Sequence, residues 1–127
     1  MTDFEIFINQ PQIIDSHVKH HISDTEALKS RYLRLKDSFT KRMYLDSKEK
    51  IPELMAEYEA SYDRVNNWLH ENLKNEEAEI LELRYLQDLS IKEISIQLHL
   101  SDGGARDRVN RAMKKAKGIY DTERREV

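Results

Sequence analysis

Apolar side chains recur along most of this chain at steps of three and four residues, the spacing of one face of an α-helix. Residues 94–100, ISIQLHL, differ because apolar and polar side chains alternate there, as in a half-buried strand. A single strand in a helical chain would leave its backbone N–H and C=O groups without partners. Ser90 and Glu93 have capping-box spacing, so we expect a helix over 91–98, with Ile96 off its buried face, and keep the strand as the alternative.

The short helix lies at the centre of a helix-turn-helix pattern. A helix over 76–86 precedes it, and residues 87–89 break the helical spacing. His99 occupies the tight turn that follows, which needs left-handed backbone, a conformation that His adopts more readily than most side chains. Ser101 then begins a helix that runs to about Lys117. The buried face of this last helix is a stripe of small residues, namely Ala105, Val109, Ala112 and Ala116.

Two longer helices are expected earlier in the chain. Ser23 and Glu26 again have capping-box spacing and predict a helix over roughly 24–45, with an apolar face of Leu28, Tyr32, Leu35 and Phe39. After residues 46–50, Pro52 suits the first turn of a second helix. The apolar seam of this second helix is Ile51, Met55, Tyr58, Tyr62, Val65 and Leu69.

These elements predict an all-α fold, in which an N-terminal helical hairpin or coiled coil precedes a helix-turn-helix. The expected parts are an N-terminal segment of unclear structure at 1–22, a hairpin with a candidate oligomerisation surface at 23–74, a helix-turn-helix DNA-binding domain at 75–118 and a charged tail at 119–127.

Composition agrees with a helical, intracellular protein. The 127 residues include no cysteine, three glycines and two prolines, and 35% of them are charged. No apolar run approaches the roughly 20 residues of a membrane span, and the N-terminus is acidic where a secretory signal is basic. We therefore expect a soluble, cytoplasmic protein of a bacterial or phage-infected cell, without a membrane partner.

Charge is arranged in blocks of opposite sign. Residues 29–50 carry eight basic and three acidic side chains (+5), and residues 51–82 carry two basic and nine acidic (−7). Residues 101–117 carry six basic and two acidic side chains (+4). The basic and acidic helices could lie antiparallel within one chain, or the second helix could pair with its copy in another chain.

The last helix presents a polar face to a partner. At 100° per residue, the positions opposite the small-residue stripe are Gly103, Asp107, Asn110 and Lys114. Asn110 or Arg106 suits the edge of an adenine or guanine in the major groove. The cations further along suit phosphate neutralisation, and they are Arg111, Lys114, Lys115 and Lys117. The alternative is that these cations only complement the helix dipole and keep the surface solvated.

The run LRYLQDLSIKEISIQLHLSDGGARDRVNRAMKKA resembles region 4 of bacterial sigma factors at unchanged spacing. The matching positions are Leu83, Arg84, Tyr85, Leu86, Leu89, Ser90, Lys92, Glu93, Ile94, Leu98, Ser101, Gly103, Arg108, Arg111, Ala112, Lys114 and Lys115. The resemblance implies a DNA-binding helix-turn-helix that can also contact RNA polymerase. A helical N-terminal part joined to such a motif looks most like small phage or prophage regulators, the ArpU-like and RinA-like activators.

Carried over from sigma factors, the DNA-facing positions open the last helix, and they are Asp102, Gly103, Gly104, Arg106 and Asp107, with Lys92 and Ser101 beside them. The chain departs from the family pattern at Gly104, where sigma factors have a side chain. Glycine there offers no base contact, although it allows a phosphate to approach the backbone of a helix N-terminus.

Other chemistry is weakly indicated. His17 and His21 are four residues apart and His20 is close, but no cysteine or obvious third ligand accompanies them, so we expect no metal and no cofactor. The chain has no nucleophile elbow, phosphate-binding loop or dinucleotide motif, and we expect no enzyme.

Two functions of different classes follow. The first is a sequence-specific transcription regulator encoded by a phage or mobile element, which binds double-stranded DNA, has RNA polymerase as a candidate partner and forms a homodimer or higher oligomer through residues 23–74. The second is a DNA-packaging adaptor resembling phage small terminase subunits. A protein that uses the sigma-like fold only to bind polymerase stays open as a third possibility.

Overall fold

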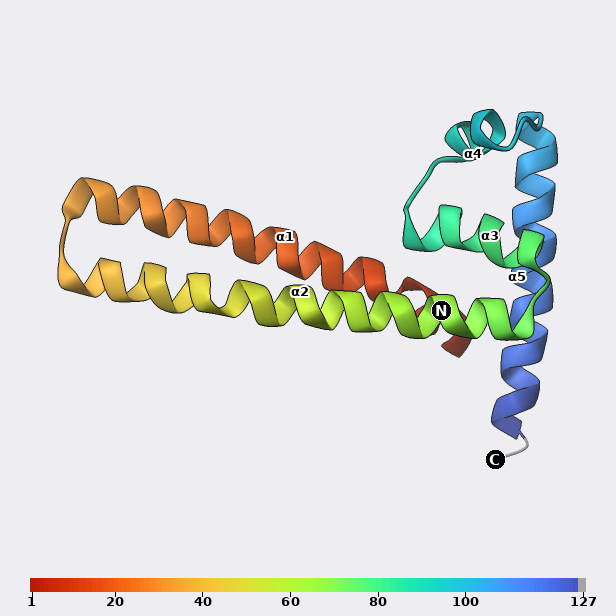
Figure 1. The fold of residues 1–127 in the computed structure, drawn as a ribbon, viewed down its shortest axis with the longest axis horizontal. Helices are drawn as coiled ribbons and strands as arrows, with labels where there is room; N and C mark the ends of the chain where they lie inside the picture. The colour runs from red at the N-terminus through yellow and green to blue at the C-terminus, as the bar shows by residue number, and fades with distance from the viewer. Residues whose placement is uncertain (126–127) are drawn as a thin grey trace. The chain divides into compact units, whose positions relative to one another are not determined.

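The computed structural model describes residues 1–125, which form α-helices and one π-helical turn without any strand (Figure 1). The predicted all-α fold is therefore confirmed. In chain order the elements are α1 (Asp3–Leu35), α2 (Ser38–Asn72), α3 (Asn75–Leu81), the π-helical turn η1 (Glu82–Leu86), α4 (Ile91–Gln97) and α5 (Asp102–Arg125).

The chain divides into two compact units, at boundaries that differ from the expected ones. The hairpin unit is residues 13–61, and the core unit is residues 1–12 together with the chain from residue 62 onward. Helices α1 and α2 each contribute to both units. The expected tail at 119–127 is helical as far as Arg125, and its last two residues lie outside the described part of the chain.

The hairpin unit consists of two antiparallel arms, one from α1 and one from α2 (Figure 1). The chain reverses at Lys36 and Asp37, not at 46–50, so the predicted helix over 24–45 is wrong. Lys36 adopts left-handed backbone, with φ of 52°. Asp37 Oδ1 accepts hydrogen bonds from the backbone N and from Oγ1 of Thr40, both at 2.6 Å, and so caps the start of α2.

The predicted N-terminal cap at Ser23 is also wrong, because Ser23 and Glu26 lie inside α1, where both are exposed. A pair of residues with capping-box spacing starts a helix only where the chain before it leaves the helical conformation, and here the helix simply continues. Residues 1–22, which gave no clear pattern, are the first half of α1.

Polar side chains occupy much of the interior of the hairpin unit. Thr25, Thr40 and Ser61 are buried, and Val18 is the buried apolar residue of residues 13–61. Thr25 Oγ1 donates to the carbonyl oxygen of His21 at 2.8 Å and lies 2.5 Å from Ser47 Oγ. His21 Nε2 lies 2.7 Å from the carbonyl oxygen of Ser47. Polar contacts therefore contribute to joining the two arms.

Several predicted seam residues lie outside this interior. Leu35 and Phe39, expected on one buried face, are 54% and 73% exposed. Met55 is 48% exposed, and Leu54 takes the half-buried position of the seam in its place. These errors share one cause, because the position of the turn decides which face of each helix meets the other arm.

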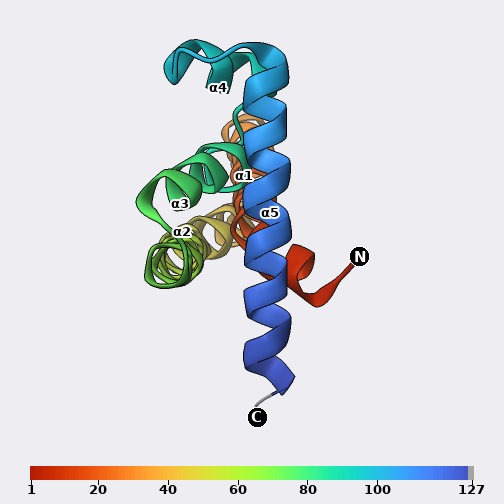
Figure 2. The same ribbon diagram turned by 90° about the vertical axis from the view of Figure 1, so that its right-hand side faces the viewer.

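The interior of the core unit is apolar and continuous. The N-terminal turns of α1 contribute to it, since Phe4 and Ile8 are fully buried with Val65 and Leu69 of α2. Figure 2 shows α5 as one long helix with these turns beside its C-terminal half. Rings from all three helices meet there: Phe7 stacks on Tyr120 with centroids 5.1 Å apart, and Trp68 lies 5.6 Å from Phe4.

Candidate DNA-binding site

The short helix α4 begins as the capping residues predict. Ser90 Oγ accepts from the backbone N of Glu93, and Glu93 Oε1 accepts from the backbone N of Ser90, both at 3.1 Å. These hydrogen bonds hold the pKa of the Glu93 carboxyl below its ordinary value. Ile94 is fully buried and Ile96 is 67% exposed, so the alternation in ISIQLHL is a helix with one apolar residue on its outer side. The strand alternative is wrong.

The turn between α4 and α5 has the geometry of a Schellman motif. His99 has φ of 56°, which confirms the predicted left-handed residue. The backbone N of Leu100 donates to the carbonyl oxygen of Ser95 at 2.8 Å, and the N of His99 donates to that of Ile96 at 3.4 Å. This pair of bonds ends α4 and fixes the direction in which the chain enters α5.

Helix α5 starts at the predicted cap and buries the predicted stripe. Ser101 Oγ accepts from the backbone N of Gly104 at 3.0 Å. The four stripe residues are at most 3% exposed, and they are Ala105, Val109, Ala112 and Ala116. Because their side chains are small, the backbone of α5 can approach its neighbours closely. The opposite face is left exposed, with Gly103, Asp107, Asn110 and Lys114 on it.

Two carboxylates among the predicted site residues make contacts within the domain. Asp102 Oδ1 accepts from Ser95 Oγ at 2.8 Å and so joins the start of α5 to α4. Asp107 pairs with Arg111 one turn later, with 2.7 Å between the carboxylate and the guanidinium. Both members of that second pair are more than half exposed, so water screens their attraction.

Lys115, one of the predicted site residues, lies on the side of α5 that faces α3. Its Nζ is 2.9 Å from Glu77 Oε1, and this hydrogen bond is the main reason that the pKa of the Glu77 carboxyl is lowered. Lys117, two residues on, is half-buried. Lys115 is exposed in spite of this contact, and the other exposed cations of the predicted site are Lys92 on α4 and Arg106, Arg111 and Lys114 on α5.

Acidic side chains of α3 line a groove beside α5. Its apolar lining residues are Ile80, Leu98 and Ala112, and its polar lining residues are Glu76, Glu77, Glu79, Arg108 and Arg111. The sequence predicted neither the groove nor the contact to Lys115, because residues 77 and 115 are far apart in the chain and only the packing of α3 on α5 brings them together.

The two glycines that open α5 differ in their surroundings. A Cβ on Gly103 would meet nothing within 4 Å, so its backbone is open to a ligand. A Cβ on Gly104 would lie 3.0 Å from Ser101 Oγ, so a larger residue would push against the capping hydroxyl. The departure from the sigma pattern at Gly104 therefore leaves the cap undisturbed.

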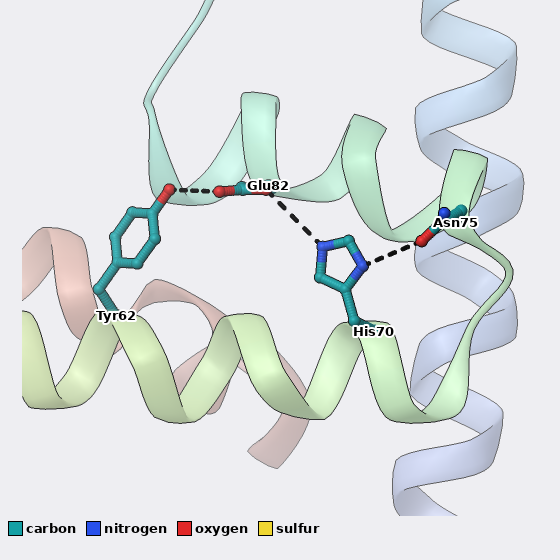
Figure 3. Close-up of polar contacts among 4 residues, drawn as sticks. All are labelled: Tyr62, His70, Asn75 and Glu82. Atoms are coloured by element: carbon teal, nitrogen blue, oxygen red, sulfur yellow. Dashed lines mark hydrogen bonds and ion pairs between the residues drawn. The ribbon is translucent and has the colours of Figure 1, made fainter.

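A polar network holds α3 and η1 against α2 (Figure 3). Tyr62 Oη donates to Glu82 Oε2 at 2.5 Å, and the other carboxylate oxygen of Glu82 lies 3.8 Å from His70 Nε2. His70 Nδ1 is 3.3 Å from Asn75 Oδ1. From α1, Gln12 Nε2 donates to the carbonyl oxygen of Leu86 at 2.6 Å. These contacts position the helix that precedes the helix-turn-helix, and sequence reasoning missed them because Tyr62 was assigned to an apolar seam.

In residues 1–125 no three side chains of the kind that bind metals are grouped as a metal site requires. His21 is engaged with Ser47, as described above. Across α1 to α5, no helix is both long and apolar enough to cross a bilayer.

Comparison with known protein families gives a match over the helix-turn-helix. The model of the family described as sigma-70, region 4 matches residues 69–115, from the last turn of α2 to the middle of α5. No curated protein and no solved structure is similar enough to match the chain. The helix-turn-helix at the C-terminal part of this chain is therefore like sigma-70 region 4, while residues 1–68 and 116–125 lie outside the match.

Proposed function

We propose that this protein is a sequence-specific DNA-binding regulator of transcription, which inserts the N-terminal half of α5 into the major groove. The observation that carries the proposal is the exposed polar face of α5, lying opposite a buried stripe within a sigma-70 region 4-like helix-turn-helix. No catalytic group enters the proposal.

The residues divide into two roles by their type and place. Asn110 and Arg106 are exposed in the first three turns of α5 and are assigned to base edges. Lys92 and Lys114 are assigned to phosphates on either side. The backbone at Gly103 is open and lies at the positive end of a long helix, which favours a phosphate there.

Two finer parts of the proposal rest on resemblance. Sigma region 4 also contacts RNA polymerase, which makes polymerase a proposed partner of the matched residues 69–115. The combination of a helical N-terminal part with this motif is like that of ArpU-like and RinA-like activators, so we propose a phage or prophage regulator.

The test begins by selecting bound duplexes from a random DNA library with the full chain. With the selected site in hand, Asn110→Ala should weaken specific binding by about 1 to 3 kcal/mol and relax preference at one base pair. The matched control is Asn67→Ala, which removes an exposed amide from α2 in the same unit. Equal affinities for selected and scrambled duplexes would reject sequence reading.

A DNA-packaging adaptor is the second candidate, and the presence of a helical hairpin and a helix-turn-helix in one chain is the observation in its favour. Such adaptors act as rings, whereas the regulator needs only a monomer or dimer. Light scattering on the full chain separates the two, because a ring of about eight or more subunits would support the adaptor and reject the regulator.

A further inference from the structure

Basic and acidic side chains gather at opposite ends of the hairpin unit. Its tip, residues 29–42, carries six basic side chains and one acidic side chain. Its base, residues 13–28 and 51–61, carries six acidic side chains and one basic side chain, and that one basic residue, Lys19, pairs with Asp15 at 2.9 Å. Tip and base thus have net charges of +5 and −5, and the six basic side chains of the tip are all exposed.

The tip also exposes large apolar side chains. Leu33, Leu35 and Phe39 are 58%, 54% and 73% exposed, and Met43 is 39% exposed one turn after Phe39. Phe39 and Met43 share a face of α2 because they are four residues apart. Apolar side chains gathered in this way beside cations are typical of a surface that is covered by a partner.

The interior of the hairpin unit gives a further reason for a partner. A pair of helices buries only one stripe from each, and here that stripe includes Thr25, Thr40 and Ser47. Helix pairs of this length are usually stabilised by packing against further helices, as in four-helix bundles. A second hairpin would supply the missing apolar contacts.

We propose that the hairpin unit pairs with the hairpin unit of a second copy of this chain, side by side and antiparallel, tip to base. The choice of partner follows from charge complementarity, because the acidic base of one copy matches the basic tip of the other. A twofold axis makes that contact twice. A parallel pair would instead place +5 against +5 and −5 against −5, which is repulsive.

Charge reversal tests the pairing by sedimentation velocity on the full chain without DNA, so the outcome is independent of DNA binding. The tip variant is Arg34→Glu with Arg42→Glu, and the base variant is Glu53→Lys with Glu57→Lys. All four residues are exposed. Each variant alone should raise the dimer Kd by at least about tenfold, because a tip of +1 or a base of −1 replaces the wild-type charge of +5 or −5 in both contacts. An equimolar mixture of the two should form heterodimers, because one of the two contacts is then the wild-type one and the other joins the two reversed patches.

A matched control separates this effect from net charge. Lys92→Glu with Lys114→Glu changes the net charge as much as the tip variant does, but it lies outside the hairpin unit and should leave the dimer unchanged. Circular dichroism of each variant should match the wild-type spectrum, because these side chains are exposed on helices.

Crosslinking tests whether the two hairpins are antiparallel. The chain has no cysteine, so an introduced cysteine is the single thiol of each variant. Lys36→Cys marks the tip and Glu59→Cys marks the base. A short bismaleimide should join the two variants to each other in a mixture and should join neither to itself. Crosslinks from tip to tip would overturn the antiparallel arrangement. A wild-type chain that stays monomeric in sedimentation would overturn the pairing itself. A tip variant with an unchanged dimer Kd would overturn it as well.

Discussion

The two units of this protein are both helical, but their interiors differ. In the core unit, Phe4, Ile8, Val65 and Leu69 are fully buried in one apolar cluster. In the hairpin unit, the corresponding layer contains hydroxyl groups bonded to each other and to backbone carbonyls. Burial of apolar area is the main favourable contribution to folding, so the core unit is expected to hold most of the stability of the chain. The hairpin unit is suited to gain stability from a partner.

The largest expected effect tests whether the N-terminal turns belong to the core unit. Phe4→Ala removes a ring that is fully buried against Trp68 and Tyr120, so the free energy of unfolding should fall by about 3 to 5 kcal/mol. Urea unfolding followed by far-ultraviolet circular dichroism measures this change.

The control for that change is Phe39→Ala in the hairpin unit. Phe39 is 73% exposed, so a dilute, monomeric sample should lose less than about 0.5 kcal/mol. Equal losses from the two Phe→Ala variants would contradict the contrast between the interiors.

The next prediction compares exposed cations of the two units, one on α5 and one at the tip of the hairpin. If DNA meets α5 and not the hairpin tip, Lys114→Ala should reduce the slope of log affinity against log salt by roughly one unit. Arg34→Ala at the tip should leave the slope unchanged, although both residues are exposed cations. Fluorescence anisotropy with one labelled duplex over a salt series measures both.

Lys115→Ala gives a stricter comparison with Lys114→Ala because the two residues are adjacent. Lys115 is held by Glu77, so its loss should leave the salt dependence of DNA binding near wild type. A slope that falls as much as in Lys114→Ala would show that DNA takes Lys115 from its carboxylate partner.

A smaller effect is expected at the turns, where each unit has its own left-handed residue. His99 in the core unit and Lys36 in the hairpin unit have φ of 56° and 52°. Glycine adopts this backbone without the steric cost of a Cβ, so His99→Gly and Lys36→Gly should each be neutral or stabilising by up to about 1 kcal/mol. Thermal melting measures both.

The control is Arg64→Gly, an exposed position inside α2 and in the same unit as His99, which should cost about 1 kcal/mol. If His99→Gly destabilised the protein as much as this control, the left-handed turn would be disproved.

The smallest effect is the response to acid. In each unit, hydrogen bonds to a carboxylate hold its pKa below the ordinary value: Thr40 bonds Asp37 in the hairpin, and Lys115 bonds Glu77 in the core unit. The stabilising contribution of such a group is complete above the unfolded pKa and is lost as pH falls through the lower folded pKa. Both units should therefore lose a little stability on acidification below about pH 4.

Carboxyl chemical shifts measured by NMR over a pH series follow each group separately. Thr40→Val should return the pKa of Asp37 toward its ordinary value, whereas the pKa of Glu77 should not move. A shift of both would mean that the two units do not titrate independently.

The parts of this fold that the sequence predicted are those decided by neighbours in the chain. Ser90 and Glu93 cap α4 through backbone groups three residues away, and His99 ends it through a local pair of hydrogen bonds. The small-residue stripe of α5 follows from helical spacing alone. Because these interactions span at most a few residues, the helix-turn-helix could be identified from the sequence of that segment alone. The resemblance to sigma region 4 could be identified from the same residues.

Tertiary structure decided the rest, because the deciding contacts join distant parts of the chain. The N-terminal turns of α1 carry no clear pattern of their own, yet they complete the core by packing on Trp68 and Tyr120. The hairpin turns at Lys36 and not near residue 48, since the choice depends on which faces of two long helices meet. Lys115 looked like its neighbour Lys114 in the sequence, and only the packing of α3 against α5 gave it a carboxylate partner in Glu77.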